Sequence, residues 1–152
     1  MANTYTQLYF HVVFVVKGRQ NLIAKKWKDE LYKYITGIIT KKHQKLLAIN
    51  GIEDHIHILL GTKPNCKLSD LVRDIKSNLS KWVNEHNFTN RKFAWQLGFG
   101  AFTLGQSQLG IIINYIKKQE EHHRSKTLNE EYIEFLKAYE VEFKEEYLFS
   151  VT

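Results

Sequence analysis

Residues 51–60 read Gly-Ile-Glu-Asp-His-Ile-His-Ile-Leu-Leu, and they decide the fold that we expect for this chain. Successive side chains of a β-strand point to opposite faces, so His55 and His57 share one face while Ile56 and Ile58 lie on the other. The apolar face suits a protein core. The face with two imidazoles suits a site, because two histidines at this spacing can bind one metal ion.

A second stretch, residues 114–123, carries further polar groups that can join such a site. The apolar residues around it recur at helical spacing, which predicts a helix that runs through Tyr115 and Gln119. Residues four apart lie on the same side of a helix, about one turn from each other. Two imidazoles, one amide oxygen and one phenol could therefore meet around a phosphate.

The strands are predicted from apolar runs and alternation. Residues 5–16 are rich in β-branched and aromatic residues and predict a central strand. Residues 46–50 and 55–60 predict two strands with hairpin spacing, joined through residues 51–54. Residues 93–104 alternate aromatic with small or polar side chains, and their second half predicts a further strand.

Amphipathic spacing predicts helices over residues 27–39 and 68–83, and a third helix that begins near Leu109. The last predicted helix opens with Thr127-Leu-Asn-Glu, which matches a capping box. We expect it to pack through four apolar and aromatic residues: Tyr132, Phe135, Leu136 and Tyr139.

The order strand, helix, strand, strand, helix, strand predicts an α+β fold of the ferredoxin-like, split βαβ type. Its antiparallel sheet carries two helices on one face, and the additional C-terminal helices follow. The histidine strand is central in this topology, so its other face is available for a site that the C-terminal helices could cover. A chain of 152 residues with 43% hydrophobic content suits a single domain, residues 1–152.

The composition limits the partners and the compartment. The 22 Lys and Arg residues exceed the 16 Asp and Glu residues, which gives a formal charge of +6 and suits a polyanionic partner. Surplus surface lysine on an ordinary soluble protein is an equally good explanation of the charge alone. The lone Cys66 excludes an internal disulfide and fits the cytoplasm, and no apolar run is long enough to span a bilayer.

The four candidate site groups suit phosphodiester chemistry. Neutral imidazole and amide ligands leave a divalent cation its full charge, with which it can polarise a phosphodiester oxygen. A tyrosine beside that phosphate can attack it and give a covalent phosphotyrosine, which conserves the energy of the broken linkage for rejoining. Taken singly, a His-x-His pair is more often no metal site and a helix tyrosine is usually a packing residue. Their conjunction favours the site.

These residues also carry a resemblance to a known family. His55-Ile-His57 resembles the histidine, hydrophobe, histidine (HUH) signature of the HUH endonucleases, and residues 115–123 resemble the tyrosine helix of their single-tyrosine transposase branch. These are the small transposases of insertion sequences that move as single-stranded DNA. Four further segments resemble the same family: residues 10–14, 68–82, 95–96 and 100–102.

The resemblance implies that Tyr115 is the nucleophile, that His55, His57 and Gln119 hold Mg²⁺ or Mn²⁺, and that a 5′-phosphotyrosine forms on single-stranded DNA. It implies recognition of imperfect hairpins near the element ends. It also implies a homodimer in which the Tyr115 helix of one subunit completes the histidine site of the other, with Gly105 placed as the hinge.

Basic clusters are the candidate DNA contacts, and aromatic residues near them could stack on unpaired bases. The ordinary alternative is that the lysines solvate helix faces and the aromatics fill the core. Lys117 and Lys118 are favoured as contacts because they flank the proposed nucleophile. The complete set is Lys41, Lys42, Arg73, Lys76, Arg91, Lys92, Lys117 and Lys118, with Phe93, Trp95 and Phe99 as stacking candidates.

Four residues after Gln119 are left outside the predicted site. His122 and His123 are expected to face solvent at a helix C-terminus, where the helix dipole favours positive charge. Glu120 and Glu121 could serve as an acid or a base.

Two other functions compete with a transposase. One is a non-catalytic nucleic-acid-binding module of the RRM type, since Gly98-Phe-Gly-Ala-Phe102 faintly resembles the RRM aromatic motif. The other is a domesticated, repeat-associated HUH nuclease with the same chemistry. A covalent protein–DNA adduct separates the binding module from both enzymes.

Overall fold

The structure, a computed structural model, describes residues 4–123 and 126–138. Its centre is a four-stranded antiparallel sheet with the order β2-β3-β1-β4. The four strands are β1 (Leu8–Val15), β2 (Lys45–Ile52), β3 (His55–Thr62) and β4 (Gly100–Leu104). This order is that of the predicted ferredoxin-like α+β fold, and it places the histidine strand β3 inside the sheet between β1 and β2.

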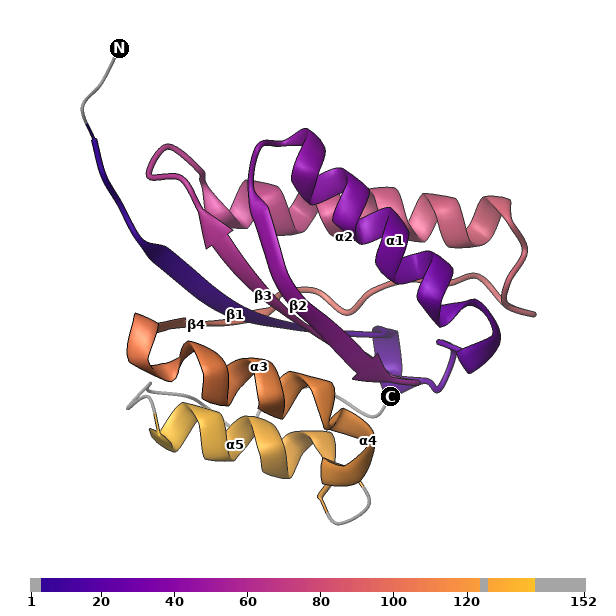
Figure 1. The fold of residues 1–152 in the computed structure, drawn as a ribbon. Coiled ribbons are helices and arrows are strands. Elements are labelled where there is room, and N and C mark those ends of the chain that lie inside the picture. The colour runs from indigo at the N-terminus through magenta and orange to yellow at the C-terminus, as the bar shows by residue number, and fades with distance from the viewer. Residues whose placement is uncertain (1–3, 124–125, 139–152) are drawn as a thin grey trace.

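Helices cover both faces of this sheet (Figure 1). The long helices α1 (Lys25–Lys41) and α2 (Leu68–Glu85) lie on one face. The other face is covered by α3 (Leu109–Lys117), α4 (Gln119–His122) and α5 (Leu128–Ala138). Short 3₁₀ turns at Lys17–Arg19 and Gln106–Gln108 join the elements. Within the described ranges, none of the helices combines the length and apolarity that crossing a bilayer requires.

The alternation predicted for residues 55–60 is confirmed in the packing of the two central strands. Ile56 and Ile58 of β3 lie in the same fully buried cluster as Val12 and Phe14 of β1, on the side of α1 and α2. The strand register pairs Phe14 with Ile56 and Val12 with Ile58. The residues between them, His57 among them, consequently point to the opposite side of the sheet.

The hairpin that leads into β3 is tighter than the sequence indicates. The strand β2 continues through Gly51 and Ile52, so only Glu53 and Asp54 form the turn, whereas residues 51–54 were expected. A Cβ at Gly51 would collide with the backbone carbonyl of His55. Glycine at this position therefore allows the strands to pair up to the turn, which fixes His55 at the very start of β3.

Helix α5 closes the second face of the sheet. The Glu130 backbone N–H donates to the Thr127 hydroxyl at 3.2 Å, which is the predicted N-cap contact. A Cβ at Gly100 would lie 2.6 Å from the Tyr132 hydroxyl, so glycine in β4 allows this close approach of α5. Phe135 packs on Phe102 of β4 with ring centroids 5.7 Å apart. The predicted packing residue Tyr139 lies outside the described residues.

Candidate active site

The histidine pair lies on the face of β3 that α3 to α5 cover, and both side chains are fully buried. Each ring has a partner on its Nδ1 side. The Nδ1 of His55 is 2.7 Å from the carboxylate of Asp54, and the Nδ1 of His57 is 2.7 Å from Nε2 of His11 on β1. Partners of this kind fix the orientation of a metal-binding imidazole. Both Nε2 atoms are thereby turned toward the C-terminal helices.

The helix that carries Tyr115 is interrupted, whereas the sequence predicts a continuous helix through Gln119. Lys118 has non-helical torsions (φ −100°, ψ 26°), and α4 begins at Gln119. The Asn50 side-chain amide on β2 donates to the Lys117 carbonyl at 3.0 Å and so takes an acceptor that the helix would otherwise use. The break turns Gln119 into the sheet, where its side chain is fully buried.

Gln119 meets His55 in an arrangement that a cation would satisfy. In the tautomer of His55 that directs its Nδ1 proton at the Asp54 carboxylate, Nε2 presents a lone pair. The side-chain oxygen of Gln119, also an acceptor, is 3.1 Å from that Nε2. The amide of Gln119 also faces Tyr115, and its hydrogen bond acts to lower the pKa of that phenol. Two acceptors at this distance are satisfied by a positive charge between them.

Tyr115 reaches the same place from α3. Its ring centroid is 5.9 Å from that of His57 in the same chain. Its hydroxyl donates to Oε2 of Glu131, a residue of α5. Burial and the adjacent Glu131 carboxylate raise the pKa of Tyr115 well above its usual value, so the phenol is protonated at neutral pH.

Glu131 is the residue that the sequence analysis missed. Its side chain is 4% exposed, and its Oε1 lies 3.1 Å from Nε2 of His57 and 3.7 Å from Nε2 of His55. Burial opposes its ionisation, but hydrogen bonds from His123 and His57 outweigh that effect and hold the pKa of Glu131 well below its usual range. Glu131 directly follows the capping-box pattern, which marks a helix start but carries no signal that the next side chain turns inward.

His123 was expected to face solvent, and that expectation is wrong. Its side chain is 7% exposed, its Nε2 is 3.3 Å from Glu131 Oε1, and its ring lies 4.6 Å from that of His55. The break at Lys118 changes the direction of the chain, so the predicted helical face no longer applies after it. His55, His57, His123 and Glu131 together form a buried group whose ligand atoms all lie within 4.8 Å of one another.

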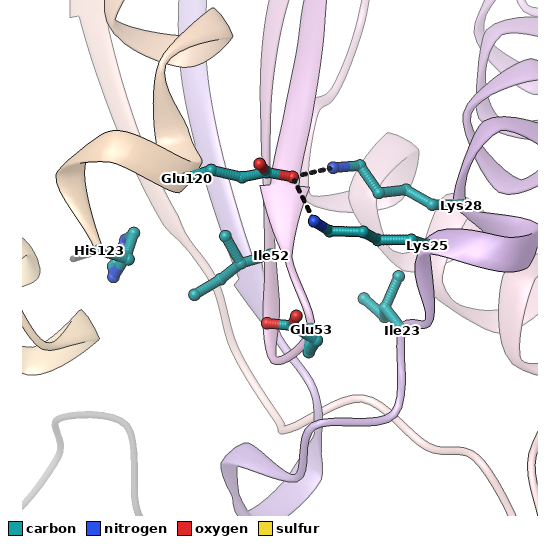
Figure 2. A pocket seen from close by; sticks show the side chains of 7 residues that line it. All are labelled: Ile23, Lys25, Lys28, Ile52, Glu53, Glu120 and His123. Carbon is teal, nitrogen blue, oxygen red and sulfur yellow. Dashed lines mark ion pairs between the residues drawn. The ribbon is translucent and has the colours of Figure 1, made fainter.

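His123 also borders a pocket that opens toward solvent (Figure 2). The pocket has a volume of about 290 Å³ and lies between α4, the β2–β3 turn and the start of α1. Across it, the carboxylate of Glu120 is 3.7 Å from the ammonium of Lys25 and 3.8 Å from that of Lys28. These ion pairs join α4 to α1, and they give Glu120 a contact role where the sequence left its role open.

The protonation states of the cluster suit metal binding. Burial lowers the pKa of His57 to about 4, even though the hydrogen bond and charge of Glu131 act to raise it. Burial, and then the nearby His57, lower the pKa of His11 to about 3. Both rings are therefore neutral at pH 7, and a neutral imidazole is the form that binds a metal. The donor set of imidazole, amide and carboxylate thus fits a divalent cation.

The predicted DNA contacts separate into two groups. Lys117 and Lys118 are exposed at the break between α3 and α4, next to the cluster. Lys76 donates to the Gln96 and Gly98 carbonyls at 2.6 and 2.8 Å, so its ammonium holds a loop. The others also lie away from the cluster. Lys41, Lys42 and Arg73 are on the α1–α2 layer, where Lys42 pairs with Asp74 and Arg73 pairs with Asp70. Arg91 and Lys92 are exposed in the loop after α2.

Two of the three stacking candidates belong to the core. Phe93 is fully buried and Trp95 is 8% exposed, and both pack in the cluster under α1 and α2. The Trp95 ring contacts those of Phe14 and Phe93, with centroids 4.8 and 4.9 Å apart. They cannot stack on a base without unfolding. Phe99 is half-buried at the edge of a groove between α2 and residues 94–99.

The same fold occurs in solved transposase structures. One is a crystal structure of a candidate transposase from Deinococcus radiodurans R1, with a TM-score of 0.64, 20% identity, and coverage of 78% of this chain and 95% of that chain. Another is a REP-associated tyrosine transposase bound to a REP hairpin, with a TM-score of 0.62, 13% identity, and coverage of 81% and 73%. The architecture of this chain is thus the fold of these transposase structures.

Sequence comparison gives the family. Residues 4–119 match the model of the family described as "Transposase IS200 like". This chain belongs to that family. It is 25% identical over 130 residues to the transposase for insertion sequence element IS200 of Salmonella typhimurium, which covers 82% of this chain and 84% of the relative. It is 21% identical over 120 residues to the ISDra2 transposase TnpA of Deinococcus radiodurans, with coverage of 76% and 86%.

Proposed function

We propose that this protein cuts and rejoins single-stranded DNA at hairpin-containing element ends, with Tyr115 as the nucleophile and a divalent cation, Mg²⁺ or Mn²⁺, at His55, His57 and Gln119. One observation carries the proposal. In a chain of the IS200-like transposase family, a tyrosine hydroxyl, two buried imidazoles and a buried amide oxygen converge on one side of a central strand.

Each residue of the proposed site has a distinct role. His55, His57 and Gln119 would hold the cation, and Asp54 and His11 orient the two rings behind them. When bound, the cation supplies positive charge that polarises the phosphodiester and offsets charge in the transition state. The helices α3 to α5 cover this face of the sheet (Figure 1), and the burial of the histidines and Gln119 would limit access of bulk water, which favours attack by the tyrosine over hydrolysis.

The reaction exchanges one phosphoester bond for another. The Tyr115 oxygen forms a bond to phosphorus and loses its proton, while the bond from phosphorus to the 3′ oxygen of the neighbouring nucleotide breaks and that oxygen takes up a proton. The product is a 5′-phosphotyrosine and a free 3′ hydroxyl. Attack of another 3′ hydroxyl on this ester reverses the step and rejoins the strand.

Tyr115 lies beside the histidine pair of its own chain, and this supports cleavage by the chain's own tyrosine. The Tyr115 hydroxyl and His57 share the carboxylate of Glu131 within the same chain. The homodimer with exchanged tyrosine helices is the second candidate arrangement. In that arrangement α3 would swing about Gly105, which has open space around its α-carbon.

A hairpin substrate and contacts from Lys117 and Lys118 are part of the same proposal. Both lysines are exposed beside the cluster, where a DNA backbone entering the site would pass. The solved relative named as bound to a REP hairpin shares the fold of this chain. A domesticated, repeat-associated nuclease would use the same residues, and it differs only in the DNA sequences on which it acts.

A binding module of the RRM type is disfavoured by the cover over the sheet. RRM domains bind RNA on an open sheet face whose aromatic residues stack with bases. Here Phe102, in the segment that resembles the RRM motif, is buried beneath α5 against Phe135 and Tyr132. The described part of this face, residues 4–123 and 126–138, therefore offers no open aromatic platform.

The test uses single-stranded oligonucleotides that carry a hairpin and flanking sequence from DNA adjoining the gene. They are incubated with the protein and Mg²⁺ or Mn²⁺ and analysed on denaturing gels. We expect a covalent protein–DNA adduct that is lost with EDTA and in Tyr115→Phe. Tyr9→Phe is a matched control and should retain the adduct. Binding without any adduct across all element-end sequences would contradict the proposal.

Mixing variants tests the arrangement of the site. If the site is built within one chain, co-refolded Tyr115→Phe and His57→Ala subunits should form no adduct. If the tyrosine helices are exchanged, mixed dimers should regain activity, with the DNA attached to the His57→Ala subunit. Tagging one subunit so that the two differ in size identifies the chain that carries the DNA.

A further inference from the structure

We propose that His123 and Glu131 complete the cation site with His55 and His57, which makes it a three-imidazole, one-carboxylate site that selects a first-row transition cation such as Mn²⁺ over Mg²⁺. This inference rests on the proposed cation at the histidine pair and goes further, because it adds two ligands and predicts which kind of cation is preferred.

The first support is geometric. Two ligands about 2.1 Å from one ion lie about 3.0 Å apart at a right angle and about 3.4 Å apart at a tetrahedral angle. Glu131 Oε1 lies 3.1 Å from Nε2 of His57, 3.3 Å from Nε2 of His123 and 3.7 Å from Nε2 of His55. All four ligand atoms lie within 4.8 Å of one another. The three separations from Glu131 fit ligands that share one ion, whereas the widest pair in the group would have to close to about 4.2 Å or less.

The second support is charge. Glu131 is 4% exposed, and a buried carboxylate is costly unless a positive charge compensates it. A divalent cation among the three rings would supply the compensation. It would also keep a net positive charge after binding one carboxylate, so it could still attract a phosphate.

The third support is the surroundings of the ligands. The rings of His55 and His57 are already held from behind by Asp54 and His11. The pocket of about 290 Å³ reaches one of the four proposed ligands, His123, from the solvent side (Figure 2). Ligands held in place and a path of entry are both needed for a working metal site.

The identity of the ligands sets the preference among cations. Imidazole nitrogens suit transition cations, whereas Mg²⁺ favours oxygen ligands and keeps several waters. With Gln119 as the third ligand, two imidazoles and one neutral amide oxygen would distinguish less between the two cations. A site with three imidazoles and an anionic oxygen should bind Mn²⁺, Co²⁺ or Zn²⁺ far more tightly than Mg²⁺.

A different role for Glu131 makes opposite predictions. Its carboxylate bridges the histidines and the Tyr115 hydroxyl, which is also where a scissile phosphate must lie. If Glu131 only blocked that position, removing its charge would leave metal affinity unchanged and increase adduct formation.

The experiment measures metal binding directly, in full-length protein freed of metal and without DNA. Mn²⁺ binding is followed by calorimetry and by the loss of the free-ion EPR signal, and Co²⁺ binding by its visible absorption. We expect one Mn²⁺ per chain, displaced by Mg²⁺ only at an excess of more than about a hundredfold. Glu131→Gln and His123→Gln should each weaken Mn²⁺ binding by at least about tenfold and alter the Co²⁺ spectrum.

Matched controls are Glu134→Gln on the exposed side of α5 and His86→Ala at the exposed end of α2, and both should bind Mn²⁺ like the wild type. Thermal melting in EDTA verifies that each variant folds. Unchanged Mn²⁺ affinity and Co²⁺ spectra in both ligand variants, with binding still lost in His57→Ala, would overturn this inference and leave the proposed function intact. Absence of Mn²⁺ binding by the wild type would overturn both.

Discussion

The two faces of the central sheet are built for different purposes. The face under α1 and α2 packs a continuous cluster of buried aliphatic and aromatic side chains from both central strands. The face under α3 to α5 has only small apolar clusters around a buried polar group. All the buried polar or charged side chains found among the described residues belong to that group: His11, Asp54, His55, His57, Gln119 and Glu131.

On the single strand β3, the residues that stabilise the fold alternate with the residues of the candidate site. Burying polar groups is unfavourable unless each finds a partner, so a fold retains them where they are needed. Ile58 and His57 are neighbours on β3, yet one belongs to the apolar cluster and the other to the polar group. Substitutions on the face under α1 and α2 should therefore mainly reduce stability, and substitutions on the face under α3 to α5 should mainly reduce activity.

The largest effect is expected for His57→Ala. Loss of this ligand and of its contact with Glu131 should reduce adduct formation by about a thousandfold or more, equivalent to about 4 kcal/mol in the barrier. The melting temperature in EDTA should fall less than in Ile58→Ala, because the variant no longer buries a polar ring. Rates of adduct formation and thermal melts measure the two quantities. Retained activity would place the chemistry elsewhere.

Ile58→Ala is the matched change on the other face. Its side chain is fully buried, and truncation should lower the free energy of unfolding by about 3 kcal/mol through lost burial and the cavity left behind. Urea denaturation measures this change. Adduct formation at a temperature where the variant is fully folded should remain within about twofold of the wild type. A large loss of activity in the folded variant would show that the two faces are coupled.

The buried imidazoles should also make the metal-free protein sensitive to acid. Burial lowers the pKa of His57 from 6.5 to about 4 and that of His11 from 6.5 to about 3, so the unfolded chain binds more protons between these values. The free energy of unfolding in EDTA should fall as the pH drops from about 6.5 to about 4.5, by as much as a few kcal/mol.

Other groups contribute little in this window. Glu131 has a lowered pKa, so its contribution is lost only below the usual glutamate value of 4.5. His123 has a raised pKa, so its contribution is already complete below 6.5. In His11→Phe the loss of stability over the same pH range should be clearly smaller, whereas His86→Phe should match the wild type. An equal slope in His11→Phe would contradict the assignment.

The smallest effect is expected for the exposed lysines beside the cluster. Lys117→Ala and Lys118→Ala should each weaken binding of hairpin DNA a few-fold and reduce the slope of log affinity against log salt by about 1. Lys92→Ala, in the loop after α2, serves as the comparison and should leave both quantities unchanged. Fluorescence anisotropy at several salt concentrations measures the slopes. Equal effects at all three positions would place DNA on both faces.

The sequence pattern was sufficient to predict the fold and to bring together the histidine pair, Tyr115 and Gln119 of the candidate site. The alternation in residues 55–60 predicts which side chains of β3 face the core, because strand geometry allows only two faces. The order of the elements predicts the sheet topology, because few arrangements accommodate it. The convergence of Tyr115 and Gln119 on the histidines followed from the conjunction of motifs and from the resemblance.

The positions of Glu131 and His123 depend on tertiary contacts that leave no periodic signal in the sequence. Glu131 meets His57 across 74 positions of sequence, and only the docking of α5 against Gly100 brings them together. The break at Lys118 depends on Asn50 of a different strand, and it redirects His123 inward. His11 could have been found, because it shares the face of Val13 and Val15 on β1, next to the histidine strand.

The most direct test of the central claim is to identify the residue that becomes attached to DNA. A hairpin oligonucleotide with a trapped cleavage site is reacted with the protein, digested to a short nucleotide remnant and analysed by peptide mass spectrometry. We expect a phosphotyrosine remnant on Tyr115 in the wild type and none in His57→Ala. A remnant on Tyr9 or Tyr132, which lie on the same side of the sheet, or on Tyr115 in His57→Ala, would contradict the claim.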